Sequence, residues 1–148
     1  MYGEKRQTMK IRPMTIDDYK QVYALWLSVP GMGLNTQDDS EESISRFLTR
    51  NPNTSMVAEK DGLIIGAILS GHDGRRGCIR HLAVAKSQQR QGTGKALVYA
   101  TLDALKKEGI PKVNLVAFAN NNEGNTFWEK LGFTTRNDLV YRDKIIKD

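Results

Sequence analysis

An Asp-Gly pair at positions 61 and 62 constrains the fold of this chain more than any other local feature. It separates two strand-like runs, residues 55–60 and 63–71. Two-residue turns of this composition join antiparallel strands, because glycine readily adopts the positive φ that such turns need. A third strand-like run follows at 78–85, after a charged loop. The sequence therefore predicts a three-stranded antiparallel meander.

The periodicity changes from strand-like to helical after the meander. Residues 92–108 carry apolar side chains at helical spacing, and Gly109 ends the run. Helices are also expected before the meander, one following the Thr15 capping box and one starting near Asp39. The remaining expected elements are strands at 10–12, 113–118 and 139–146 and a helix at 123–131.

The element order predicts an α/β fold. The order is β-α-α-β-β-β-α-β-α-β, which indicates a central mixed, mostly antiparallel sheet flanked by helices. A length of 148 residues fits one domain. We expect residues 1–9 to form a flexible tail and residues 10–148 to form a single domain.

Composition excludes several classes of protein. No apolar stretch approaches the roughly 18–20 residues of a membrane span, and the polar N-terminus does not resemble a signal peptide. A cytoplasmic location is therefore expected. Cys78 is the only cysteine and the chain has two histidines, so neither a disulfide nor a metal site is expected. The net charge of +5 suggests an anionic partner: nucleic acid, a membrane surface or a phosphorylated small molecule.

A glycine-containing loop at 89–95 is the best candidate for an anion site. Its sequence, Gln-Arg-Gln-Gly-Thr-Gly-Lys, lies between a predicted strand and a long predicted helix. A helix N-terminus offers unpaired N–H groups, and two glycines let a phosphate approach them closely. The spacing fits neither a P-loop nor the dinucleotide fingerprint, since Ala96 follows the lysine and Leu97 replaces the third glycine. The loop indicates pyrophosphate binding, and the alternative is a helix start without a ligand.

The strand before this loop alternates. Regular pleating places Arg80, Leu82 and Val84 on one face and Ile79, His81 and Ala83 on the other. A strand that leads directly into a phosphate-binding loop can offer backbone groups to the rest of a ligand that carries amides.

A second dense region spans residues 121–133. Asn121 can cap a helix, aromatic side chains give that helix an apolar face, and Gly132-Phe133 closes it. The region is either a well-capped amphipathic helix or the wall of a cleft in which Asn121 holds a polar ligand.

Together these two regions resemble the GNAT superfamily of N-acetyltransferases. Residues 89–94, with the strand 81–84 before them, resemble its acetyl-CoA pyrophosphate signature, and residues 121–133 resemble its later Asn…Gly-Phe pattern. The resemblance covers the chain from Lys10 onward. It implies a GNAT-like fold, direct transfer of an acetyl group from acetyl-CoA to a primary amine, and a possible homodimer. The cofactor-binding residues that it implies are Leu82, Ala83, Val84, Gln89, Arg90, Gln91, Gly92, Thr93, Gly94, Lys95, Asn121 and Trp128.

The sequence offers several candidates for the catalytic groups. An alkylamine with a pKa of about 10.4 is unprotonated in only about one molecule in two thousand near pH 7, so the reaction needs a base or a water relay. His81 is a candidate, with His72 and Asp73 as alternatives. Trp128 stands where many relatives place a tyrosine that protonates the leaving thiolate, so Tyr141, water or no group fills that role. Cys78 is expected to be a small buried residue and not a nucleophile.

Two other functions remain open. One is an acyl-CoA-binding module with little or no transferase activity, for which the tryptophan at 128 is the only support. The other, nucleic-acid binding, has no basic stripe interleaved with aromatics to support it. The acceptor amine of the transferase, whether small molecule or peptide, is not indicated.

Overall fold

The computed structural model describes residues 8–147, and the expected tail at 1–9 falls mostly outside them. The described chain divides into two units, one ending at Val116 and the other beginning at Ala117. Each is described here by itself.

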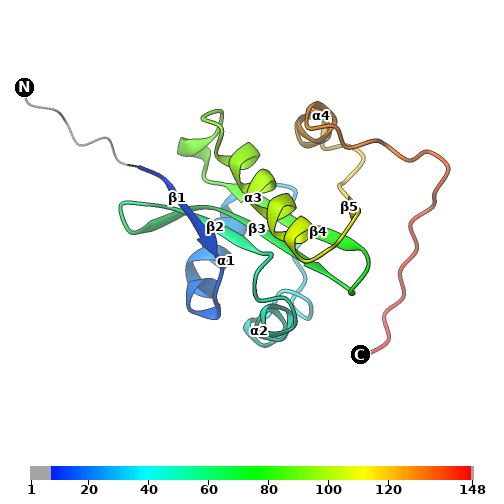
Figure 1. Cartoon of the computed structure of the whole chain (residues 1–148), viewed down its shortest axis with the longest axis horizontal. Coiled ribbons are helices and arrows are strands. Elements are labelled where there is room, and N and C mark those ends of the chain that lie inside the picture. Colours follow the sequence, from blue (N-terminus) through cyan, green and yellow to red (C-terminus); the bar gives the residue numbers. More distant parts are fainter. Residues whose placement is uncertain (1–7, 148) are drawn as a thin grey trace, which may run out of the picture. The chain divides into compact units, whose positions relative to one another are not determined.

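The first unit is built on a five-stranded sheet of order β1-β2-β3-β4-β5 (Figure 1). Its strands are β1 (Lys10–Pro13), β2 (Met56–Lys60), β3 (Leu63–His72), β4 (Gly77–Val84) and β5 (Val113–Leu115). Only the last pair, β4 with β5, is parallel. The expected mixed, mostly antiparallel sheet is therefore confirmed, although β5 is shorter than the predicted 113–118.

The predicted hairpin is present at its predicted position. Lys60 pairs with Leu63, and the two turn residues between them, Asp61 and Gly62, have φ of 53° and 75°. Both angles lie in the left-handed region that two-residue hairpin turns require.

Three α-helices accompany the sheet: α1 (Tyr19–Ser28), α2 (Glu41–Arg50) and α3 (Thr93–Lys107), with 3-10 turns at Ile16–Asp18 and Lys86–Gln88. The Thr15–Asp18 capping box forms as predicted. Helix α2 begins slightly later than expected, because Ser40 is its cap and accepts the Ser43 N–H. Asp39 lies just before the cap and serves another purpose, described below.

The helices cover both faces of the sheet (Figure 1). Helices α1 and α2 enclose one core against the sheet, and α3 packs on the opposite face, where a Cβ at Gly66 or Gly77 would meet leucines of α3. The core on the α1 and α2 side consists of Met14, Val22, Leu25, Trp26, Ile44, Leu48, Val57, Ala67, Leu69 and Ala83.

A β-bulge at Arg80 corrects the predicted alternation of β4. Leu69 pairs with His81 while its neighbour Ser70 pairs with Ile79, so Arg80 is an extra residue without a partner on β3. An extra residue reverses the parity of the strand beyond it. His81 and Ala83 therefore share the α1 and α2 face, and Ile79 lies on the α3 face instead of joining them. Arg80 itself is exposed.

The second unit contains α4 (Asn122–Lys130), close to its predicted span. The prediction of a final strand at 139–146 is wrong, since these residues form no strand in the described chain. Large apolar side chains of residues 139–146 are exposed, among them Val140 at 72% and Ile146 at 97%. Strand-like composition yields a strand only where a neighbouring strand completes the hydrogen-bond ladder, and this unit has none among its described residues.

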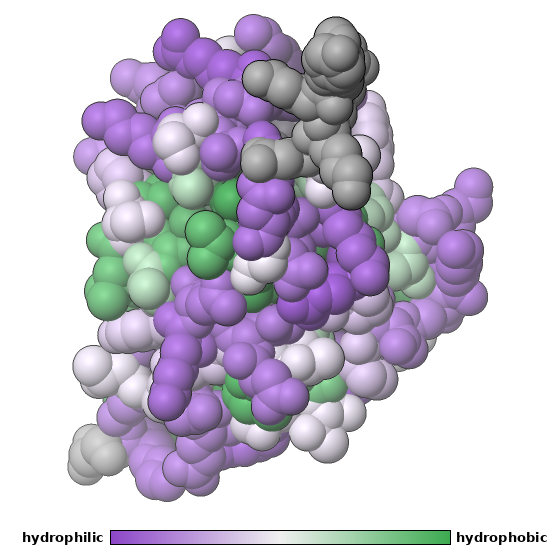
Figure 2. Space-filling model, turned by 90° about the vertical axis from the view of Figure 1, so that its left-hand side faces the viewer, coloured by the Kyte–Doolittle hydropathy of each residue, from purple (hydrophilic) through white to green (hydrophobic). Residues whose placement is uncertain are grey.

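One face of the molecule is largely hydrophilic, with apolar areas between the polar ones (Figure 2). In the first unit, Leu27 and Leu63 are among the exposed large apolar side chains, each about two-thirds accessible. Within residues 8–147, no helix combines the length and apolar character that crossing a membrane requires.

Candidate functional site

The glycine loop forms an open helix N-terminus. Gly92 is the cap residue of α3, has φ of 83°, and has no side chain that bonds the first turn. Arg90, two residues earlier, also has a positive φ, 64°. Alternation of left- and right-handed residues turns successive N–H groups toward one side, which creates an anion-binding concavity at the positive end of the helix dipole.

The loop and the first turn of α3 carry two basic residues. Arg90 and Lys95 are exposed, and Lys95 Nζ lies 5.8 Å from the centre of the Tyr99 ring. Gln89 Nε2 donates to the Val84 carbonyl at 3.0 Å, which ties the loop to the end of β4. Among the other loop residues, Gln91 is exposed and Thr93 is buried. The loop thus presents positive charge over a backbone that the strand holds in place.

Strand β4 has a free edge next to the loop. Its pairing with β5 covers only Gly77, Cys78 and Ile79 and stops at the bulge. Because Ala85 donates to the Ile65 carbonyl and antiparallel bonding alternates, the backbone groups of Leu82 and Val84 point away from β3. Ala83 alternates with them, facing β3 with its backbone and the core with its side chain. The groups that β5 leaves unpaired are therefore the N–H and carbonyl of Leu82 and the N–H of Val84, since Gln89 already bonds the Val84 carbonyl.

His81 lies beyond the bulge and is bonded to a buried carboxylate. Its Nε2 is 2.8 Å from Asp39 Oδ1, and the two side chains are 14% and 6% exposed. The indole ring of Trp26 packs edge-on against the imidazole, with 4.9 Å between ring centres. Among the described residues, no group bonds His81 Nδ1. This nitrogen is therefore available to accept a proton.

His72 lacks such an available nitrogen. Its Nδ1 accepts the Gly74 N–H at 2.9 Å, and its Nε2 lies 2.9 Å from Glu108 Oε1. Because Nδ1 accepts a hydrogen bond, the proton of the neutral ring is on Nε2, which donates to Glu108. Both ring nitrogens of His72 are therefore already hydrogen-bonded. Its neighbour Asp73 closes the β3–β4 loop. Backbone N–H groups of Arg76 and Arg75 bond its carboxylate and hold its pKa below the usual value. The geometry thus favours His81 over both alternatives.

Cys78 fits its expected structural role. Its side chain is partly buried, and burial raises the pKa of the thiol, an effect that the positive charge of Arg80 opposes. A thiol with a raised pKa is a poor nucleophile at neutral pH, because the thiolate is the reactive form.

The remaining predicted site residues lie in the second unit. Asn121 caps α4, with its Oδ1 accepting the Gly124 N–H at 3.0 Å. Trp128 packs edge-on against Phe127 and Phe133, with 5.1 Å between ring centres in both pairs. Tyr141 is 66% exposed. Asn121 is thus a helix cap, as one interpretation of the sequence expected, while ligand contacts by these three residues stay predictions.

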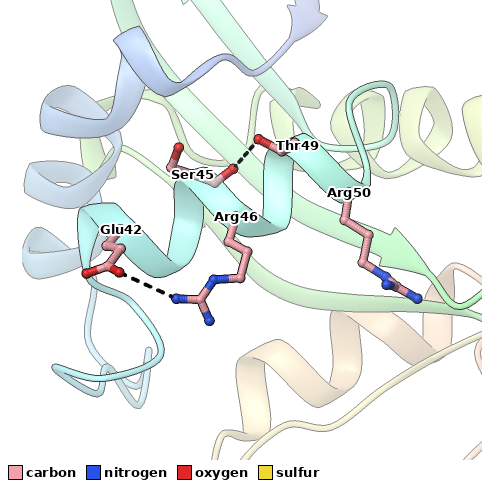
Figure 3. A pocket seen from close by; sticks show the side chains of 5 residues that line it. All are labelled: Glu42, Ser45, Arg46, Thr49 and Arg50. Atoms are coloured by element: carbon pink, nitrogen blue, oxygen red, sulfur yellow. Dashed lines mark hydrogen bonds and ion pairs between the residues drawn. The ribbon is translucent and has the colours of Figure 1, made fainter.

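A shallow hollow of about 590 Å³ runs along α2 (Figure 3). Its lining side chains are Glu42, Ser45, Arg46, Thr49 and Arg50. Two of its polar contacts are internal: the Glu42–Arg46 ion pair at 3.8 Å and the Thr49 hydroxyl bonded to the Ser45 carbonyl. It shares no residue with the glycine loop or with His81.

Sequence reasoning missed Asp39 and Trp26 as neighbours of His81. Asp39 was expected at the start of a helix and Trp26 on a helical apolar face. Their contact with His81 joins residues more than 40 positions apart, so no local pattern carries it.

Comparisons with known proteins identify the family of this chain. The model of the acetyltransferase (GNAT) family matches residues 19–133. An acetyltransferase of Yersinia pestis is 31% identical over 140 residues, which cover 95% of this chain and 98% of that protein.

Solved structures show the same fold. The paiA N-acetyltransferase of Thermoplasma acidophilum, in complex with coenzyme A, has a TM-score of 0.76 at 19% identity, with 87% of this chain and 91% of that one covered. The aminoglycoside N-acetyltransferase AAC(6')-Iy, also in complex with CoA, has a TM-score of 0.76 at 18% identity, covering 97% and 99%. By its family match and its relatives, this chain belongs to the GNAT family of N-acetyltransferases.

Proposed function

We propose that this protein transfers an acetyl group from acetyl-CoA to a primary amine. The observation that carries the proposal is the junction of two free backbone surfaces. The edge of β4 at Leu82 and Val84, which β5 does not cover, leads through the turn at Lys86–Gln88 to the open N-terminus of α3. A long ligand with amides at one end and a pyrophosphate further along matches that order of donors and acceptors.

The charges of the loop fit the phosphates. Arg90 and Lys95 extend from the segment whose N–H groups form the concavity, so the dipole of α3 and two formal charges act on the same anion. Coenzyme A bound to the two solved proteins of the same fold supports this ligand. Part of the net charge of +5 is thereby assigned to the cofactor.

His81 serves as the base in this proposal. The acceptor ammonium transfers a proton to Nδ1, and the free amine attacks the thioester carbonyl. The new C–N bond forms as the C–S bond breaks, and the second proton that the nitrogen loses passes through water to the thiolate of CoA, which gives the amide and free CoA. Cys78 takes no part, so no acyl-enzyme forms.

A glutamate at position 94 tests the cofactor site. Gly94 lies in the first turn of α3 with a helical φ, so Gly94→Glu places a carboxylate at the anion site without backbone strain. Negative charge at a helix N-terminus favours the helix, so the fold should persist. We expect acetyl-CoA to raise the Tm of the wild type and not of the variant.

Lys106→Gln is the matched control, because it changes the net charge equally at the exposed C-terminal end of the same helix. It should keep the Tm response to acetyl-CoA. An equal response in Gly94→Glu and the wild type would refute the proposed site.

One observation favours a second candidate, an acyl-CoA-binding module. The indole of Trp128 cannot donate a proton to a leaving thiolate at neutral pH, whereas a tyrosine can. Thiol titration of released CoA, run over small amines, polyamines and peptides, distinguishes the two. Tight binding of acetyl-CoA without release by any acceptor would favour the module.

A further inference from the structure

The pairing of His81 with Asp39 has a chemical consequence that rests on the proposed function. An ionised carboxylate can only accept hydrogen bonds, so the 2.8 Å contact requires the proton on His81 Nε2. The lone pair of the neutral ring is then on Nδ1, the nitrogen without a partner among the described residues. A base needs that lone pair.

We propose that Asp39 is a positioning residue that holds His81 in the Nε2–H tautomer and in a fixed orientation. Asp39 does not touch the reacting atoms in this proposal. It acts through His81, and it stabilises the imidazolium that forms when Nδ1 takes the proton of the acceptor amine. The pair is mostly buried, with the imidazole 14% and the carboxylate 6% exposed, so water weakens it little.

The position of Asp39 is itself fixed by three further contacts. Its Oδ2 accepts the Asn35 N–H at 2.8 Å, and its backbone N–H donates to the Asn35 carbonyl at 2.9 Å. Its backbone carbonyl accepts the Tyr19 hydroxyl at 2.6 Å. The segment between α1 and α2 therefore presents this carboxylate to β4 in one geometry.

Trp26 supplies the other wall. Its ring is 1% exposed and packs edge-on against the imidazole, which limits rotation of His81 about its side-chain bonds. An imidazole with one bonded nitrogen and one packed side keeps a single orientation. This is the arrangement that general base catalysis needs.

Other ionisable groups lie near the pair. Tyr19 and Tyr23 on α1 stack with 5.6 Å between ring centres. The pKa of Tyr19 is raised mainly by burial and further by Tyr23, Glu41 and Asp39. Tyr19 donates a hydrogen bond to the Asp39 carbonyl, and its raised pKa keeps the phenol neutral in the physiological range, so it adds no charge beside the pair.

The second His–carboxylate pair of the chain provides a matched control. His72 Nε2 and Glu108 Oε1 lie 2.9 Å apart, against 2.8 Å for His81 and Asp39, but the other nitrogen of His72 is already bonded by the Gly74 N–H. Glu108→Gln thus alters a comparable pair that has no free lone pair. It should leave the acetyl-transfer rate unchanged.

The test is Asp39→Asn. The amide oxygen can still accept the Asn35 N–H, while the amide NH₂ faces Nε2 and forces the proton onto Nδ1. Nitrogen-15 NMR of the imidazoles should show His81 change from the Nε2–H to the Nδ1–H tautomer. We expect kcat to fall by about 10² or more, within the range that a general base supplies. The KM for acetyl-CoA should stay within about twofold, since binding of cofactor is not affected.

Two results would overturn the proposal. One is an unchanged tautomer with an unchanged kcat in Asp39→Asn. The other is an added loss of kcat when Asp39→Asn is introduced into His81→Gln, because a residue that acts only through His81 has no effect once His81 is absent. If the wild type transfers acetyl to no amine, the proposed function fails by itself, and the NMR tautomer still decides whether Asp39 positions His81.

Discussion

Gly66 of β3 and Leu97 of α3 lie so close that a Cβ at position 66 would be 2.9 Å from Leu97 Cδ1. The same Cβ would lie 3.2 Å from Thr93 Cγ2, in the first turn of α3. Both neighbours are buried, so neither has room to withdraw. The absence of a side chain at 66 thus lets the helix that carries the glycine loop pack onto the sheet.

Gly66→Ala should therefore destabilise the fold and disturb the loop. Forcing a methyl group into a packed core costs about 1–3 kcal/mol in the free energy of unfolding, measured by urea denaturation. Leu97→Val in the Gly66→Ala background should recover part of the loss, because it removes a crowded methyl group. If the loss of unfolding free energy in the double variant equals the sum of the losses in the two single variants, the side chains at positions 66 and 97 do not contact each other.

Asp18 should make the free energy of unfolding depend on pH in the acid range. Arg12 bonds both of its oxygens, at 2.8 and 2.9 Å, and Thr15 N–H bonds one, so the pKa of Asp18 is lowered in the fold mainly by Arg12. A lowered folded pKa means that its stabilisation is complete above the unfolded value of about 3.9 and is lost as the pH falls through the folded value. The free energy of unfolding should fall in that window.

Asp18→Asn should flatten this dependence and cost about 1–3 kcal/mol at pH 7. Asp103→Asn is the control, because Asp103 pairs with Lys107 on the exposed surface of α3. Its pH profile should match that of the wild type, since exposed pairs contribute little. Parallel profiles for the two variants would contradict the role of Asp18.

Arg90→Gly should separate cofactor affinity from stability. Glycine adopts the φ of 64° more easily than arginine but loses more entropy on folding, so the two effects nearly cancel. The free energy of unfolding should change by less than about 1 kcal/mol. The Kd for acetyl-CoA, from calorimetry, should rise about fivefold through loss of one exposed charge. A steeply destabilised variant would indicate that the Arg90 side chain holds the loop.

Cys78 should react slowly with thiol reagents. Its raised pKa and partial burial keep the thiolate fraction low, so its rate with a disulfide reagent at pH 7.5 should lie below that of a free cysteine and approach it in urea. Cys78→Ala should keep acetyl transfer, because the acceptor amine attacks the thioester directly. Loss of turnover in a folded Cys78→Ala protein would instead support a mechanism in which Cys78 forms an acyl-enzyme.

Local patterns predicted the elements whose cause is local. The Asp61-Gly62 hairpin and the Thr15–Asp18 capping box depend on a few adjacent residues, and both are present as predicted. The start of α3 directly after Gly92 likewise depends on adjacent residues. The GNAT family, recognised on the order of two motifs, is confirmed by the family match.

Features that depend on pairing partners could not be predicted. The bulge at Arg80 is set by the register of β4 on β3, and the predicted strand at 139–146 has no partner among the described residues of its unit. The contact of His81 with Asp39 depends on how a loop folds back onto the sheet. A homodimer, a cytoplasmic location and the lack of a metal stay predictions.

The bulge also separates two segments of β4 that have different neighbours. Ile79 and the residues before it pair with β5, whereas His81 and the residues after it have no second strand beside them among the described residues. Because Leu69 opposes His81 and Ser70 opposes Ile79, removal of Arg80 would restore regular pleating and leave His81 on the face of Asp39 and Trp26. The side on which His81 lies therefore depends on its pairing with Leu69 and not on the residue inserted before it.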